Sequence, residues 1–207
     1  MGVRIGVLAL QGDVSEHVFA FRRALELLGL ENRSEVKAFR DNGSICQLDA
    51  IAIPGGESTT ICRLIDRRGM RESLVSFDGA LFLTCAGLVI AAREVEDAGE
   101  LVKPLGIMDI GVKRNAFGRQ RESFEADLEI NGLAEPFHAI FIRAPVIIAS
   151  GKDVRPIAHV PEGIVGVEQG IHLAFAFHPE LSGDLRLHLR FLKGLMGIEW
   201  PSAFTDK

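Results

Sequence analysis

The sequence predicts one α/β domain built on a mainly parallel β-sheet. Short apolar runs such as residues 3–10 are rich in β-branched side chains, the composition of strands that are buried on both faces. In the first half of the chain, each of these runs is followed by a turn signal and an amphipathic helical pattern, which is the order of a βαβ unit. A length of 207 residues, of which 47% are hydrophobic and 25% charged, suits one globular domain.

The first half is expected to alternate strands and helices. Its first strand is expected at residues 3–10. Asp13, with Glu16 three residues later, resembles a capping box that starts a helix, and Gly29 is the expected stop. The following strands are expected at residues 48–53 and 80–84, and the following helices at residues 58–68 and 86–94.

The second half lacks long helices between its strand-like runs, which indicates antiparallel strands added to the parallel core. These strands are expected at residues 108–113, 124–130, 138–142, 164–168 and 172–177. Gln169-Gly170 is expected to turn a hairpin between the last two, and residues 185–196 form an amphipathic helical pattern. We therefore predict a single domain over residues 1–200 and a C-terminal tail over residues 201–207.

Composition and charge exclude several classes of protein. The net charge of −5 argues against nucleic acid as the main partner, because phosphate binding needs an excess of lysine and arginine. The three cysteines are too few and too scattered for a disulfide scaffold or a zinc cluster, which favours a reducing, intracellular compartment. The longest nearly apolar run, residues 81–92, is about half of the roughly 20 residues that a membrane span needs. Without a cleavage site after the N-terminal apolar run, we expect a cytoplasmic protein.

The strongest chemical signal is the segment Leu83-Thr84-Cys85-Ala86-Gly87. A strand runs into Cys85 and a helix begins at once, as in a nucleophile elbow with a thiol in place of a hydroxyl. The helix N-terminus stabilises a thiolate, and the N–H of Ala86 would point to where an oxyanion forms. Gly87 lets the helix approach the sheet closely. The alternative is an ordinary buried cysteine at the end of a strand.

A second signal is Phe177-His178-Pro179-Glu180, which follows a strand-like run. In extended chain, residues two apart project to the same side, so the Glu180 carboxylate can fix the tautomer of the His178 imidazole and support its charged form. A cysteine followed far downstream by a histidine is the chain order of a Cys–His nucleophilic enzyme. The alternative is a histidine and a glutamate in a surface loop.

A third signal is Pro54-Gly55-Gly56-Glu57-Ser58-Thr59-Thr60, directly after a predicted strand. Its two glycines permit positive φ and expose backbone N–H groups to a ligand. The alternative is an ordinary βα turn in which Ser58 or Thr59 caps the helix. A phosphate-binding P-loop is excluded, because no Gly-Lys-Ser/Thr follows.

Together these three features resemble class I glutamine amidotransferases, whose fold is a three-layer, flavodoxin-like α/β arrangement. Further blocks narrow the resemblance to the glutaminase subunits of pyridoxal 5′-phosphate synthase; they are Leu8 to Gly12, Pro54 to Thr60, Arg114 to Gln120 with Ser123 to Glu125, and Phe141 to Pro145. The similar segments run from residue 5 to residue 181. One departure is Leu83, where this family usually has glycine two residues before the nucleophile.

The resemblance implies that the chain hydrolyses L-glutamine to L-glutamate and ammonia. Cys85 would attack the side-chain amide, His178 would act as acid and base, and Glu180 would orient His178. The oxyanion hole would be made by the N–H groups of Ala86 and of Gly55, the latter either directly or after a flip of its peptide. The glutamine site would be formed by Gly56, Glu57, Ser58, Arg114, Ile142 and Arg143.

The resemblance also implies a partner, a synthase subunit with a (β/α)8 barrel that receives the ammonia in a hetero-oligomer. The partner surface would include Gln11 and residues 54–60. Because this chain would bind neither sugar nor pyridoxal phosphate, no cofactor and no metal are expected. The alternatives are a glutaminase subunit of histidine or purine synthesis, a Cys-elbow peptidase or glyoxalase, and a non-catalytic binding subunit. Such peptidases commonly place histidine directly after the nucleophile, where this chain has Ala86.

Overall fold

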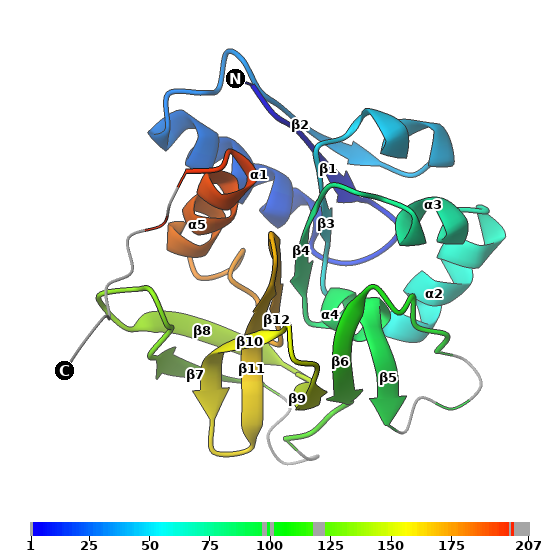
Figure 1. The fold of residues 1–207 in the computed structure, drawn as a ribbon, viewed down its shortest axis with the longest axis vertical. Coiled ribbons are helices and arrows are strands. Elements are labelled where there is room, and N and C mark those ends of the chain that lie inside the picture. The colour runs from blue at the N-terminus through cyan, green and yellow to red at the C-terminus, as the bar shows by residue number, and fades with distance from the viewer. Residues whose placement is uncertain (1, 97–98, 100–101, 118–122, 199, 201–207) are drawn as a thin grey trace.

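The computed structural model describes residues 2–96, 99, 102–117, 123–198 and 200 (Figure 1). The helices are α1 (Val14–Leu27), α2 (Ser58–Arg67), α3 (Arg71–Val75), α4 (Ala86–Ala91) and α5 (Arg186–Leu195), with a 3-10 helix at Asn42–Gln47. The strands are β1 (Arg4–Leu8), β2 (Glu35–Phe39), β3 (Ala50–Ile53), β4 (Ala80–Thr84), β5 (Ala92–Glu96), β6 (Met108–Lys113), β7 (Ser123–Leu128), β8 (Phe137–Ile142), β9 (Val146–Ser150), β10 (Arg155–Val160), β11 (Gly163–Gln169) and β12 (His172–Phe175).

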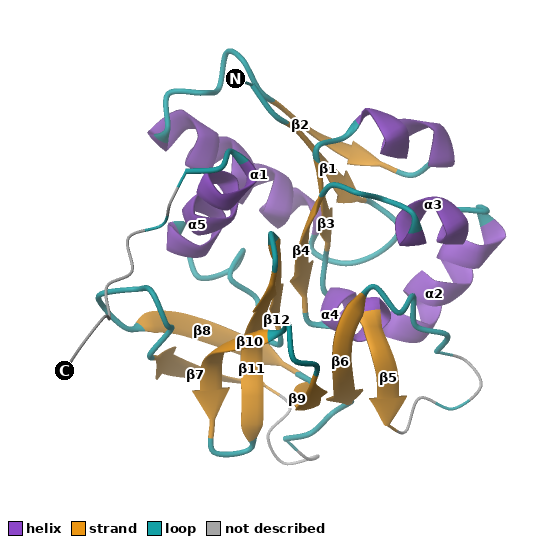
Figure 2. Ribbon diagram, in the orientation of Figure 1, coloured by secondary structure: helices purple, strands orange, loops and turns teal. Residues whose placement is uncertain are grey.

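The central sheet has the strand order β2-β1-β3-β4-β12-β11-β9-β6-β5, and β10 pairs with β11. The strands β2, β1, β3, β4 and β12 are parallel to one another, and β11 and β9 join the sheet in antiparallel pairs. Helices cover both faces: α1 and α5 lie on one side, and α2, α3 and α4 lie on the other (Figure 2). This arrangement confirms the predicted three-layer α/β fold with a mainly parallel core.

Two apolar cores lie on the two faces of the sheet. Phe21 of α1 and Phe191 of α5 belong to the core of the first face, and Ile61 and Ile65 of α2 belong to that of the second. The strands between them are buried on both faces, as β3 and β4 are at every position. Leu83 is fully buried in the second core, so the space beside the elbow accommodates its side chain there.

Several elements differ from the expectation. The helix predicted over residues 86–94 ends at Ala91, and β5 begins at the next residue. Parallel pairing of β5 with β6 supplies main-chain hydrogen bonds that override the helical pattern of residues 92–94. Strands β7 and β8 form a separate antiparallel pair and do not extend the central sheet. Some elements of the structure were not predicted from the sequence: β2, β5, β9, β10, α3 and the 3-10 helix.

The hairpin predicted at Gln169-Gly170 is confirmed, because β11 and β12 pair in antiparallel register with Gln169 opposite His172. The division into a domain over residues 1–200 and a tail stays a prediction, since residues 201–207 lie outside the described residues. None of the described helices combines the length and the apolar character that a membrane crossing requires.

Candidate active site

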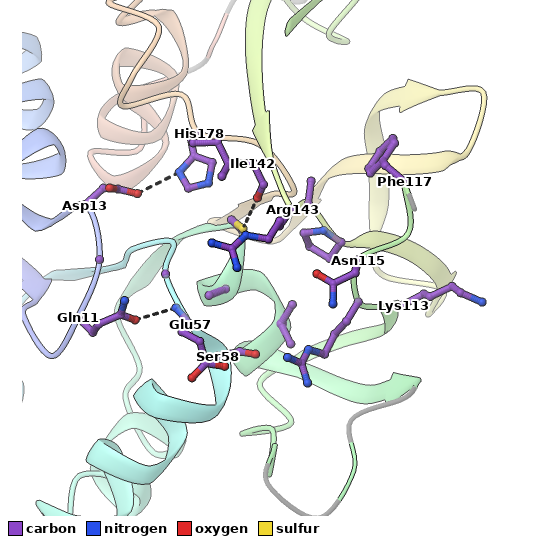
Figure 3. A pocket seen from close by; sticks show the side chains of 18 residues that line it. Gln11, Asp13, Glu57, Ser58, Lys113, Asn115, Phe117, Ile142, Arg143 and His178 are labelled. Atoms are coloured by element: carbon purple, nitrogen blue, oxygen red, sulfur yellow. Dashed lines mark hydrogen bonds and ion pairs between the residues drawn. The ribbon is translucent and has the colours of Figure 1, made fainter. Parts of the chain in front are cut away.

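A cleft of about 870 Å³ opens at the carboxyl ends of the parallel strands. The loops after β1, β3, β4 and β12 all reach it, which is where the sites of open α/β sheets occur. Figure 3 shows side chains from these loops and from the segments after β6 and β8 around one space. The cleft is lined by Gln11, Gly12, Asp13, Gly56, Glu57, Ser58, Cys85, Ala86, Val89, Lys113, Arg114, Asn115, Phe117, Ile142, Arg143, Ala144, Pro145 and His178.

Cys85 stands between β4 and α4 with φ 45° and ψ −103°, a conformation that side-chain-bearing residues seldom adopt. Such backbone strain costs about 1–3 kcal/mol and persists only where the surrounding packing imposes it. Gly87 contributes to that packing: a Cβ there would lie 2.0 Å from the carbonyl oxygen of Ile53. Cys85 is only 7% exposed, and its Sγ donates to the carbonyl oxygen of Ile142 at 3.6 Å. The structure therefore has the predicted elbow geometry.

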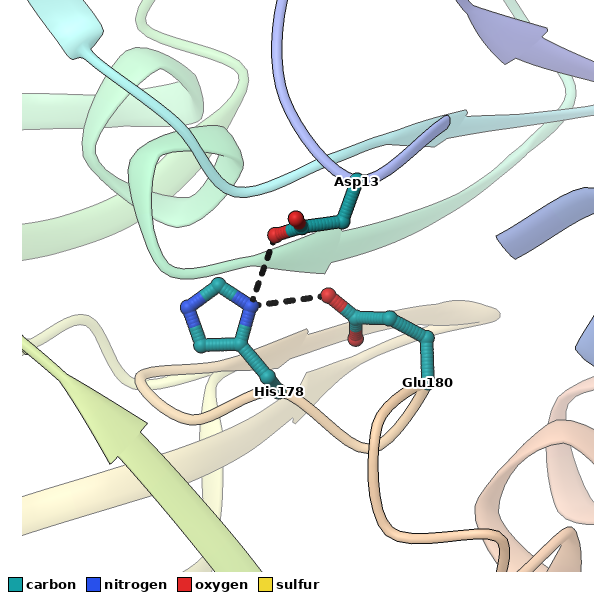
Figure 4. Close-up of side chains that lie close together, drawn as sticks. All are labelled: Asp13, His178 and Glu180. Carbon is teal, nitrogen blue, oxygen red and sulfur yellow. Dashed lines mark hydrogen bonds and ion pairs between the residues drawn. The ribbon is translucent and has the colours of Figure 1, made fainter. Parts of the chain in front are cut away.

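His178 and Glu180 touch as their spacing predicts. Nδ1 of His178 lies 2.8 Å from Oε1 of Glu180, and both residues are buried (Figure 4). The backbone N–H of His178 donates to the carbonyl oxygen of Ile140 at 2.9 Å, and this hydrogen bond holds the backbone of the loop in place. Burial raises the pKa of Glu180, but the adjacent His17 and His178 outweigh it and hold that pKa below its ordinary value.

The charged form of His178 is strongly favoured. Burial alone lowers the pKa of His178, but the nearby Asp13, Cys85 and Glu180 outweigh this effect and raise the pKa to about 12. At neutral pH the imidazole therefore holds a proton on both nitrogens. An imidazolium beside a cysteine stabilises the thiolate, which is the nucleophilic form of the side chain.

Asp13 is a site residue that the sequence analysis assigned to a different role. It was expected to cap α1, but its side chain makes no capping hydrogen bond. Its Oδ2 lies instead 3.3 Å from Nδ1 of His178, on the same nitrogen that Glu180 contacts (Figure 4). Because Asp13 borders the cleft and Glu180 is fully enclosed, the imidazole ring is held between an outer and an inner carboxylate.

Asp13, His178 and Glu180 each offer a ligand atom within 4.8 Å of the others, which is close enough for the three to bind one metal ion. Both carboxylates approach the same ring nitrogen, at 3.3 and 2.8 Å. A metal ion would need the lone pair of that nitrogen directed at it, whereas the nitrogen is hydrogen-bonded to Oε1 of Glu180 at 2.8 Å. The geometry is that of two acceptors sharing one N–H.

Gly55 lies in the predicted loop but its N–H is directed away from the cleft. It donates to Oγ1 of Thr84 at 3.0 Å, in a buried contact. The ring of His178 packs against Gly55 so closely that a Cβ at residue 55 would lie 2.3 Å from Cε1. Ala86, the other predicted oxyanion donor, borders the cleft beside Cys85.

The glycine-rich loop is held by its neighbour after β1. The N–H of Glu57 donates to Oε1 of Gln11 at 2.7 Å, and a Cβ at Gly12 would lie 1.7 Å from the carbonyl oxygen of Gly55. Glu57 caps α2, since its carboxylate accepts from the N–H groups of Thr59 and Thr60, and neither Ser58 nor Thr59 acts as the cap. Burial raises the pKa of Glu57, but these hydrogen bonds lower it to about 2.

Other residues of the cleft come from segments far along the chain. Arg114 borders the cleft, and so do Ile142 and Arg143, which Figure 3 labels. Arg143 has φ 44° and Asn115 has φ 47°, so both stand in the left-handed region. Residues 118–120 of the predicted Arg114 to Gln120 block lie outside the described residues. The structure thus brings together all the described residues predicted for the glutamine site.

Comparisons with known proteins agree with this geometry. The model of the SNO glutamine amidotransferase family matches residues 7–196. A pyridoxal 5′-phosphate synthase subunit PdxT of Methanosphaerula palustris is 56% identical over 195 residues, which is 94% of this chain and 98% of the relative. The PdxT of Methanoculleus marisnigri is also 56% identical, over 94% of this chain and 99% of the relative.

Solved structures show the same fold. A crystal structure of a glutamine amidotransferase is 44% identical with a TM-score of 0.81, over 93% of this chain and 98% of that chain. The acivicin-bound glutaminase domain of Trypanosoma brucei CTPS is 13% identical with a TM-score of 0.60, over 99% and 98% of the two chains, and supports the fold alone. With a family model that covers residues 7–196 and relatives that are 56% identical over nearly their full length, this chain belongs to the SNO glutamine amidotransferase family.

Proposed function

We propose that this chain hydrolyses L-glutamine to L-glutamate and ammonia, as the glutaminase subunit of a pyridoxal 5′-phosphate synthase. The observation that carries the proposal is the thiol of Cys85 on a strained elbow, in one cleft with a His178 that is paired to buried Glu180. Nucleophile, base and orienting carboxylate come from the ends of two adjacent parallel strands, β4 and β12. This is the set of groups that nucleophilic acyl transfer needs.

In the first half-reaction the Cys85 thiolate attacks the side-chain amide carbon of glutamine. The C–N bond breaks as the His178 imidazolium gives its proton to the leaving nitrogen, which departs as ammonia and leaves a γ-glutamyl thioester. In the second, neutral His178 takes a proton from water, and the hydroxide that forms displaces Cys85 from the thioester. Glu180 stabilises the imidazolium in both steps without contacting the substrate.

The oxyanion of each tetrahedral intermediate needs hydrogen-bond donors in the cleft. Ala86 begins α4, so its own helix offers no acceptor for its N–H, and it borders the cleft next to Cys85; both observations support this role. The N–H of Gly55 becomes the second donor only after its peptide turns away from Thr84. Removing one such donor typically costs about 3–4 kcal/mol of transition-state stabilisation.

The two arginines of the cleft suit the α-carboxylate of glutamine. Among the residues that the structure describes, neither Arg114 nor Arg143 is hydrogen-bonded or ion-paired through its guanidinium. A guanidinium can hold a carboxylate through two parallel hydrogen bonds, so these side chains would fix the substrate at the end opposite its reacting amide. Gly56, Glu57, Ser58 and Ile142 complete the glutamine site.

The ammonia is passed to a synthase subunit, which we propose is a (β/α)8 barrel in a cytoplasmic hetero-oligomer with this chain. Two curated relatives are named as subunits of pyridoxal 5′-phosphate synthase, which supports such an assembly. The docking face includes Gln11 and the loop at residues 54–60, because these border the cleft and hold each other through the Glu57 N–H. A partner seated there can move the Gly55 peptide.

The test is ammonia release from glutamine by the purified chain, with and without the synthase subunit. Slow hydrolysis alone and faster hydrolysis with the synthase are expected. If the mixture releases no ammonia from glutamine, the chain is not a glutaminase. If the rate is the same with and without the synthase, the glutaminase assignment stands and the coupling through residues 54–60 is wrong.

A further inference from the structure

A chain of buried polar contacts runs beneath the cleft and joins Glu180 to the glycine-rich loop. His17 of α1 is fully buried, and its Nε2 lies 3.4 Å from Oε1 of Glu180 and 3.0 Å from Oγ1 of Thr84. Thr84, also fully buried, accepts the N–H of Gly55 at 3.0 Å. The contacts therefore connect His178 to Gly55 through Glu180, His17 and Thr84.

The positions of the protons in this chain follow from its charges. Glu180 is ionised, because the two neighbouring histidines hold its pKa below the ordinary value against the effect of burial. A ring nitrogen that faced this carboxylate with its lone pair would be repelled, so Nε2 of His17 carries a hydrogen. That hydrogen is donated to Oγ1 of Thr84 at 3.0 Å, while the carboxylate of Glu180 lies 3.4 Å from the same nitrogen. The Thr84 oxygen thus receives two N–H donors, one from His17 and one from Gly55.

This arrangement holds the Gly55 N–H outside the cleft. Cys85, Ala86 and Gly56 line the cleft, whereas Gly55 and Thr84 do not. A buried N–H must keep an acceptor, and the Thr84 hydroxyl is the one it has in this orientation. Gly55 has no side chain to oppose a rotation of its peptide, so the hydrogen bond to Thr84 decides which way the N–H points.

We propose that Thr84 is a positioning residue whose hydroxyl holds the Gly55 amide in a resting orientation, and that His17 fixes this hydroxyl to the Glu180 carboxylate. The inference rests on the proposed function, which gives the Gly55 amide a role in oxyanion binding. Glutamine hydrolysis without the synthase is then limited by the fraction of molecules in which the Gly55 amide has left Thr84. The buried contacts make that release depend on the same carboxylate that orients His178.

The direct test is nuclear magnetic resonance of the Gly55 amide in the isolated chain, which needs no glutamine. In the wild type this amide should exchange slowly with solvent. In Thr84→Val, which keeps the shape and removes the hydroxyl, its proton resonance should move upfield and its exchange should become faster. Thr84→Ser should restore both properties. An unchanged Gly55 amide in folded Thr84→Val overturns the proposal, and so does a wild-type Gly55 amide that exchanges at the rate of an unprotected one.

Thr84 is fully buried, so Thr84→Ala serves as the second variant if Thr84→Val does not fold. Ser76→Ala is the matched control, because it removes a hydroxyl that also makes a hydrogen bond, to the carbonyl oxygen of Glu72 at 2.8 Å, on the surface of α3. Its Gly55 resonance should coincide with that of the wild type. A shift of the Gly55 resonance in Ser76→Ala as large as that in Thr84→Val would mean that the effect is not specific to Thr84, and would overturn the proposal.

The second test is the ratio of glutaminase rates with and without the synthase. Loss of the Thr84 hydrogen bond should raise the rate of the isolated chain by about tenfold and reduce the stimulation ratio by the same factor. Thr84→Ser should recover the stimulation ratio. An unchanged ratio in Thr84→Val, with a wild type that hydrolyses glutamine, overturns the role of Thr84 and leaves the glutaminase assignment intact. A wild type without glutaminase activity overturns the proposed function, whatever the amide of Gly55 shows.

Discussion

The cleft is made of two groups of residues that differ in burial and pairing. The inner group, Cys85, His178 and Glu180, is 7%, 3% and 8% exposed, and His178 and Glu180 are paired before any substrate arrives. The outer group, Arg114 and Arg143, comes from the segments after β6 and β8 and presents two guanidinium groups without a partner among the described residues. The inner group is organised for the reaction, and the outer group is organised to receive a ligand.

The difference between the two groups indicates that one acts on the reaction rate and the other on substrate binding. Groups that are preorganised by burial stabilise charge that develops in the transition state, so their loss lowers kcat. Groups that meet the substrate only through its non-reacting end contribute equally to the ground state and the transition state, so their loss raises KM.

The largest effect is expected for Cys85→Ala in the inner group. Without the thiolate no acyl-enzyme can form, so ammonia release should fall by at least about 10⁴-fold. Circular dichroism and binding to the synthase should be unchanged, because alanine fits the space that Cys85 occupies. Substantial remaining ammonia release would show that Cys85 is not the nucleophile.

The next effect is expected for Glu180→Gln. The amide cannot stabilise the imidazolium, so kcat should fall by about 10²- to 10⁴-fold while KM changes little. Glu125→Gln is the matched control, because Glu125 contacts Nε2 of His138 at 3.0 Å on the exposed β7–β8 pair. Steady-state kinetics of both variants decide the matter. A rise in KM with unchanged kcat in Glu180→Gln would place Glu180 in the outer group.

Arg143→Gln tests the outer group. The substituted side chain has a Cβ as arginine does, so the backbone strain at φ 44° is the same and the positive charge is lost. KM for L-glutamine should rise by about 10- to 100-fold, the value of a hydrogen-bonded charge pair, with a smaller change in kcat. Arg93→Gln, which breaks the surface pair of Arg93 with Asp109, should leave KM unchanged. An equal fall in kcat and kcat/KM would assign Arg143 to the reaction itself.

Asp13→Asn tests a residue that lines the cleft and also contacts His178 of the inner group. Asp13 raises the pKa of His178, so its neutralisation lowers that pKa. Because the imidazolium must protonate the departing ammonia, activity on the alkaline side should be lost at lower pH than in the wild type, with a change in kcat at neutral pH of only a few fold. Glu16→Gln, which removes a carboxylate from the first turn of α1, is the control. Coincident alkaline limbs of the pH–rate profiles of Asp13→Asn and the wild type would contradict the assignment.

The smallest effect on kcat and KM is expected for Cys62→Ser, because Cys62 belongs to neither group. Burial raises the pKa of Cys62, and its Sγ donates to the carbonyl oxygen of Lys103 at 3.6 Å, so the reactive thiolate form is disfavoured; Cys62 is also not among the residues that line the cleft. A diazo-ketone analogue of glutamine should label Cys85 alone, and free glutamine should suppress the labelling. Mass spectrometry that finds adducts on Cys62 or Cys46, or labelling insensitive to glutamine, would contradict the division between the thiols.

Local signals determined the inner group. The elbow could be predicted from the sequence because a strand, a cysteine and a glycine-containing helix start are contiguous. His178 and Glu180 could be paired because residues two apart in extended chain share a side. The hydrophobic period likewise predicted β4 and β6 at their observed bounds. In each case the information lies within a few consecutive residues.

Only the tertiary structure decided what depends on contacts between distant segments. Asp13 has the sequence signal of a helix cap, but the approach of the β12 loop offers it a charged imidazole, which binds a carboxylate more strongly than the N–H groups of a helix end. The first residues of β5 have the sequence pattern of a helix, and only their pairing with β6 makes them a strand. The orientation of the Gly55 N–H depends on Thr84 and His17, which are 29 and 38 positions away. A local pattern carries no information on such choices, because the partner that decides each one is brought near only when the sheet has formed.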